Sequence, residues 1–147
     1  MNVPFKPDAP PEWNLADLYA GRDDPRIETD LSAAKAANDE LASLEGMFLE
    51  ARKEPQRLGV LLDRGITLYE QATNGLWGVG AYAGLAASVA RDDPAWSKFE
   101  ADLRARSSQI AAESLYFTLE LNQLEDTEIA KALDAHPEAA RWAPWLR

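Results

Sequence analysis

Few residues of this chain could do chemistry, and the only histidine, His136, comes first among them. A histidine ring can bind a metal ion or act as a general base near neutral pH. Either role needs partner side chains, and the polar stretch around His136 and Pro137 places none nearby. The sequence has no cysteine, which excludes disulfides, thiolate catalysis and cysteine-ligated zinc. We therefore interpret His136 as a loop or capping residue and predict no catalytic residue and no metal ligand in the chain.

Carboxylates are abundant, but the sequence singles out no acid–base pair among them. Glu120 lies two residues from Asn122, and Glu125 is adjacent to Asp126. General acid–base catalysis uses a carboxyl group whose pKa is tuned by its surroundings, commonly by an apolar pocket. No such pocket can be inferred here, so we interpret Asp126 as a helix N-cap.

A glycine-rich stretch over residues 78–83, with the sequence GVGAYA, matches the loose fingerprint of dinucleotide-binding loops. That fingerprint needs a preceding strand and a βαβ unit, because the glycines form the turn between strand and helix. The residues just before it, ITLYEQATN, favour a helix instead. We therefore interpret the match as accidental.

Composition bounds the class of protein. The chain has 147 residues, 25 acidic and 15 basic, and a formal net charge of -10. Such a charge argues against a nucleic-acid surface and against docking on anionic lipid, since both need basic clusters. A hydrophobic fraction of 46% is enough for the core of one domain. The N-terminus shows no apolar segment of a signal peptide, so we expect a cytoplasmic protein.

The elements that would position these residues are helices. Proline is favoured at the first helical position, and a preceding aspartate can cap the free amides. Four prolines that follow a polar residue predict helix starts, at Asp24-Pro25, Glu54-Pro55, Asp93-Pro94 and His136-Pro137. In two of them the preceding residue is an aspartate. Apolar residues spaced by three and four predict helices over residues 25–52, 56–91, 94–122 and 127–135, with a last turn in 137–147.

These elements predict an all-α fold: an antiparallel bundle of three long helices with one or two short C-terminal helices. No stretch alternates with the period of a strand. Four prolines before Trp13 predict an irregular N-terminal arm over residues 1–22, packed on the bundle. The bundle domain then covers residues 23–147.

Residues 71–90 form an uncharged run of twenty. The run is long enough to span a bilayer, but most of its residues are small or polar, and Glu70 and Arg91 flank it without a positive bias. We therefore predict a central bundle helix rather than a membrane span. Gly80 and Gly84 lie one turn apart, and we expect another helix to approach closely there.

The chain ends in an apolar segment that contains Trp142, Trp145 and Leu146. Two interpretations stay open. These side chains pack on the bundle, or they form an interdomain or self-association surface.

Three stretches of the sequence together resemble a known family. They are residues 13–19 (WNLADLY) with 24–31, then Tyr69-Glu70 with 81–83 and Arg91-Asp92, and last 115–122 (LYFTLELN) with 145–147. In this order and spacing they resemble the N-terminal region of the oligoendopeptidase F family, the bacterial branch of the thimet-type (M3) zinc metallopeptidases. The resemblance covers nearly the whole chain.

The resemblance implies a helical lobe that, with a catalytic lobe, encloses a channel for short peptides. It also implies zinc in the full-length enzyme, held by a His-Glu-x-x-His helix and a further glutamate. With one histidine this chain cannot contain that motif, so we expect a non-catalytic lobe whose partners are the missing catalytic domain and short peptides. The alternative is a free-standing helical interaction module without enzymatic activity. Under either interpretation a second copy of the chain is a further expected partner.

Overall fold

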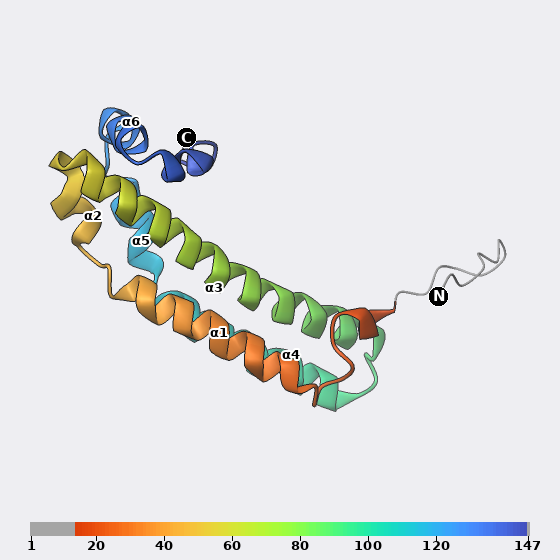
Figure 1. The fold of residues 1–147 in the computed structure, drawn as a ribbon. Helices are drawn as coiled ribbons and strands as arrows, with labels where there is room; N and C mark the ends of the chain where they lie inside the picture. The colour runs from red at the N-terminus through yellow and green to blue at the C-terminus, as the bar shows by residue number, and fades with distance from the viewer. Residues whose placement is uncertain (1–13, 147) are drawn as a thin grey trace, which may run out of the picture.

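The computed structural model describes residues 14–146, and their regular structure is entirely helical (Figure 1). The three long helices are α1 (Pro25–Ala42), α3 (Pro55–Val89) and α4 (Pro94–Ala112). α1 and α4 both pack along α3 and run opposite to it. The predicted all-α class and the antiparallel arrangement of three long helices are confirmed.

Shorter elements cover the two ends of α3. Those at its beginning are α2 (Met47–Glu50), the 3-10 turn η2 (Ala51–Lys53), α5 (Leu115–Leu121), α6 (Asp126–Ala135) and the 3-10 turn η3 (Pro137–Trp142). The turn η1 (Leu15–Asp17) lies at the other end, where Tyr19 is buried. Of the predicted N-terminal arm, residues 1–13 lie outside the described residues.

All four predicted helix starts are found. The side chains of Asp24 and Asp93 accept hydrogen bonds from the N–H groups of Arg26 and Ala95, each at 2.9 Å, and so cap α1 and α4. The interpretation of Asp126 as an N-cap was wrong. Glu125 caps α6 in a capping box with Glu128, because a glutamate at the third helical position can reach back to the cap's N–H.

Two predicted helices are interrupted, which corrects the ranges 25–52 and 94–122. The first ends at Ala42 and resumes at Met47, after Gly46 has adopted a left-handed φ of 82° that suits glycine. The second ends at Ala112 and resumes at Leu115. Apolar spacing continues across both breaks because the segments on either side face the same core, so periodicity alone did not reveal them.

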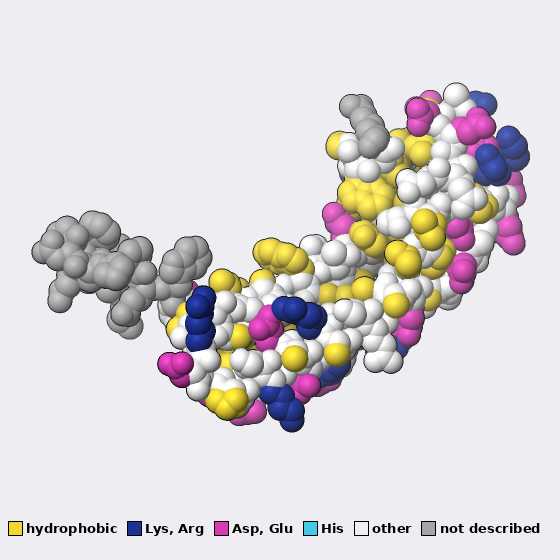
Figure 2. Space-filling view, turned by 180° about the vertical axis from the view of Figure 1, so that it is seen from behind, with side chains coloured by type: hydrophobic (Ala, Val, Ile, Leu, Met, Phe, Trp, Pro, Cys, Tyr) yellow, Lys and Arg dark blue, Asp and Glu magenta, His cyan; other side chains and the backbone are white. Residues whose placement is uncertain are grey.

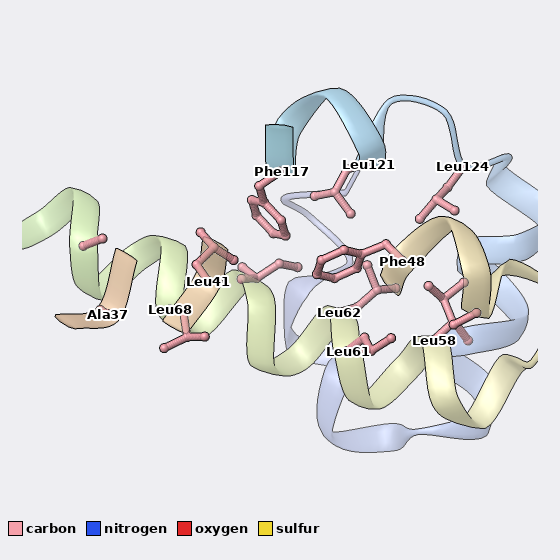
Figure 3. Packing of buried hydrophobic residues seen from close by; sticks show 14 residues of the cluster. Ala37, Leu41, Phe48, Leu58, Leu61, Leu62, Leu68, Phe117, Leu121 and Leu124 are labelled. Atoms are coloured by element: carbon pink, nitrogen blue, oxygen red, sulfur yellow. The ribbon is translucent and has the colours of Figure 1, made fainter. Parts of the chain in front are cut away.

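The core consists of two clusters along α3. In the larger one, Phe48 from α2 and Phe117 from α5 are fully buried and pack edge to face, with ring centroids 5.3 Å apart (Figure 3). The smaller cluster joins η1, α1, the second half of α3 and α4. It comprises Tyr19, Ile27, Leu31, Val79, Tyr82, Ala83, Ala86 and Leu103.

Close helix contacts occur at glycines other than the predicted ones. A Cβ on Gly59 would lie 2.5 Å from the carbonyl oxygen of Ala132, and one on Gly75 would lie 3.0 Å from Ala34 Cβ. At Gly80 a Cβ would meet nothing within 4 Å among the described residues, and at Gly84 only a glutamate oxygen at 4.0 Å. Among residues 14–146, the expected close approach of another helix is therefore not made at Gly80 or Gly84.

The uncharged run belongs to α3, as predicted. Within the described part of the chain, no helix combines the length and hydrophobicity that a membrane crossing requires.

Candidate functional site

A groove of about 650 Å³ lies between α3 on one side and α4 and α5 on the other. We call it the α3–α4 groove. Its lining includes Leu76, Trp77 and Gly80 from α3, and Ser107 and Ala111 from α4. None of its lining residues is charged, although 27% of the chain is. Apolar side chains are exposed along one face of the molecule, with charged side chains between them and at both ends (Figure 2).

Trp77 is the most conspicuous side chain of the groove. It is 74% exposed, and Leu115 across the groove is 65% exposed. Single exposed apolar residues are ordinary, but a large aromatic beside an uncharged hollow is typical of a binding surface. The sequence analysis did not single out Trp77. Its only signal was its place in the uncharged run 71–90.

Two residues that line the groove carry buried polar atoms without partners among the described residues. Asn38 is 1% exposed and donates its side-chain N–H to the carbonyl oxygen of Ile110 at 2.8 Å. Among residues 14–146, neither the Asn38 Oδ1 nor the hydroxyl of Ser107 has a hydrogen-bond partner. Buried polar atoms are nearly always paired, so each such exception needs an explanation. Both residues line the groove.

The C-terminal residues singled out from the sequence lie on the bundle. The Trp142 indole N–H donates to Asp63 at 2.8 Å, and Trp145 stacks on Phe117 with ring centroids 6.2 Å apart. Leu146 packs against the larger core cluster, while Trp145 remains 40% exposed. These contacts show that the three side chains pack on the bundle, and they do not test the second interpretation, an interdomain or self-association surface. None of these three residues lines the α3–α4 groove.

The residues that the sequence analysis considered for catalysis or ligand binding do not form a common site among residues 14–146. His136 ends α6, and its Nδ1 lies 3.4 Å from a Glu138 oxygen. Between residues 14 and 146, no group of three histidine, aspartate or glutamate side chains is placed to hold a metal ion. The stretch 78–83 lies in the middle of α3, with no strand before it, so its resemblance to a dinucleotide loop is accidental.

The best-organised charged cluster ties α6 to η2. The Glu128 carboxylate is buried and accepts hydrogen bonds from Arg52 at 3.0 and 3.1 Å and from Lys53 at 3.2 Å. It also accepts the N–H of Glu125 at 3.1 Å, which completes the capping box. The Arg52 guanidinium, followed by the Glu125 N–H, lowers the pKa of Glu128 to about 2. All of these partners belong to the fold, so the cluster is structural.

This cluster predicts a measurable loss of stability in acid. In the unfolded chain the pKa of Glu128 returns to its ordinary value of 4.5. The stability that its depressed pKa provides is complete above that value and is lost as the pH falls from 4.5 toward 2. We expect the melting temperature of the wild type to fall more steeply across this interval than that of Glu128→Gln, measured by circular dichroism.

The matched control for this titration is Glu70→Gln, at an exposed position on α3. Its pH profile should run parallel to that of the wild type. Parallel profiles for Glu128→Gln and the wild type would contradict the role given to Glu128.

Comparisons with known proteins found no match: no protein-family model, no curated protein and no solved structure matches this chain. Its function must therefore be inferred from its own residues and surface.

Proposed function

We propose that this chain is the N-terminal, non-catalytic helical lobe of an oligopeptide-cleaving zinc metallopeptidase of the M3 type. In that role it forms part of the wall of the substrate channel. The observation that carries the proposal is the way in which the three stretches of family resemblance meet in space.

Two aromatic clusters join those stretches. Tyr19 from the first stretch packs edge to face on Tyr82 from the second, with ring centroids 5.0 Å apart. Tyr69 from the second stretch contacts Phe117 and Trp145, both from the third, at 5.4 and 5.8 Å. Residues from all three stretches therefore contact one another in the aromatic parts of the core. This is expected if what the chain shares with the family is the architecture of a lobe.

The zinc of such an enzyme does not fit the residues of this chain. A catalytic zinc site uses three protein ligands and leaves a position open for water. The chain has one histidine, beside Glu138 at the end of α6, and no further ligand is placed with it among residues 14–146. In this proposal the other lobe holds the metal, and no step of hydrolysis belongs to the residues described here.

The test is to sequence the native transcript beyond the codon for Arg147. An open frame of several hundred codons that encodes His-Glu-x-x-His is the expected result. A stop codon directly after Arg147 would contradict the proposal, because no catalytic lobe would then belong to the polypeptide.

The second candidate function is a free-standing helical interaction module. The observation that favours it is the α3–α4 groove, where Trp77 stands exposed beside an uncharged hollow. Surfaces of this kind accept the apolar face of a partner helix. A stop codon after Arg147 would make this the better proposal.

A further inference from the structure

We propose that the α3–α4 groove is a self-association surface, on which two copies of this chain form a two-fold dimer and each copy inserts Trp77 into the groove of the other. The inference concerns the chain by itself and does not depend on the peptidase proposal. It uses residues other than Trp142, Trp145 and Leu146, the candidate surface of the sequence analysis.

The first argument is geometric. A two-fold interface uses the same surface patch on both copies, so that patch must carry both the projecting group and the hollow that receives it. The α3–α4 groove has both: Trp77 is 74% exposed, and the adjacent hollow is bordered by small residues such as Gly80 and Ala111. A patch that carried only a hollow would fit a different partner instead.

The second argument concerns charge. Two chains that each carry a net charge of -10 repel one another, and they can approach closely only through a surface that places no carboxylates face to face. The lining of the groove is uncharged. Beyond it, in the neighbouring hollows along α4, Glu100 is paired with Arg104. Added salt screens the remaining repulsion, so this dimer becomes tighter as salt rises, whereas a complex with a basic partner would become weaker.

The third argument concerns how closely two helices can approach. Gly80 and its neighbour Ala81 form part of the lining, and no described residue lies within 4 Å of the place where a Cβ of Gly80 would be. Small residues on a helix face let a second helix come near. No helix among residues 14–146 takes that place, and a second copy of α3 fits it.

The decisive experiment compares two glycines of α3. Gly78 and Gly80 both have open space where a Cβ would be, but only Gly80 lines the groove. Glutamate at either position adds the same charge and the same gain in helix propensity. We expect the wild type and Gly78→Glu to sediment as concentration-dependent dimers, and Gly80→Glu as a monomer under the same conditions. Circular dichroism checks that all three are equally helical.

A second pair of variants tests Trp77 itself. Trp77 and Val89 are both exposed apolar residues of α3, at 74% and 81%, so replacing either leaves the core intact. We expect Trp77→Ala to raise the dimer dissociation constant by at least ~30-fold, as is typical of a central tryptophan in an interface. Val89→Ala, outside the groove, should leave it unchanged.

Three outcomes would overturn the inference. They are a wild-type monomer at every concentration and salt level, equal effects of Gly78→Glu and Gly80→Glu, and oligomers that keep growing beyond two copies. The last would show a head-to-tail contact in place of a closed two-fold one. These outcomes are independent of the transcript that tests the peptidase proposal, so the two can fail separately.

Discussion

Replacing Phe117 with alanine is expected to lower the free energy of unfolding by about 3–5 kcal/mol. Phe117 is fully buried in the larger core cluster, where its ring contacts Phe48, Tyr69 and Trp145. Alanine would remove the ring and leave a cavity among side chains that come from three separate segments. The helix α5 is only seven residues long, so it has little stability of its own without this anchor.

The measurement is urea denaturation followed by circular dichroism at 222 nm. The matched control is Leu119→Ala, because Leu119 lies on the same short helix but is 56% exposed. Its effect should stay within about 0.5 kcal/mol, as is usual for surface positions. If the two variants lost equal stability, Phe117 would not be the anchor of α5.

The fold was predictable from the sequence where local chemistry decides it. Asp24 and Asp93 each cap a helix by accepting a hydrogen bond from the N–H group two residues later in the sequence. Because these contacts are local, both caps could be recognised from the sequence without tertiary information. The breaks around Gly46 and Ser114 are different. The N–H of Gly46 donates to Glu120, and Phe48 turns inward to meet Phe117, and both partners lie about seventy residues away. The spacing of apolar residues along the sequence does not reveal such long-range contacts.

For a related reason, the sequence predicted the helix that carries the groove but not the groove itself. The uncharged run 71–90 indicated a helix that packs on several sides, and α3 is that helix. Which side stays open depends on how many helices the chain supplies to cover it. Gly75 meets Ala34 of α1, whereas nothing described covers Gly80, and this difference is a property of the assembled bundle. Trp77 therefore became a candidate only when its exposure was known.

The packing of α6 on α3 depends on Gly59, a residue that the sequence analysis did not single out. We expect Gly59→Ala to destabilise the protein by about 1–3 kcal/mol. The added Cβ would lie 2.5 Å from the carbonyl oxygen of Ala132 and 2.5 Å from His136 Cβ. That carbonyl already accepts a hydrogen bond from the N–H of His136 at 3.0 Å, so it cannot reorient without breaking this bond. The whole of α6 must then move off α3. This outweighs the gain of up to about 1 kcal/mol that alanine brings to a helix.

Gly78→Ala is the matched control for this change, on the same helix but with open space where the Cβ would be. There the gain in helix propensity acts alone, and stability should rise by roughly 0.5–1 kcal/mol. Urea denaturation of both variants should therefore show shifts of opposite sign. A stabilised Gly59→Ala would mean that α6 does not pack against this turn of α3, because only contact with α6 distinguishes the two sites.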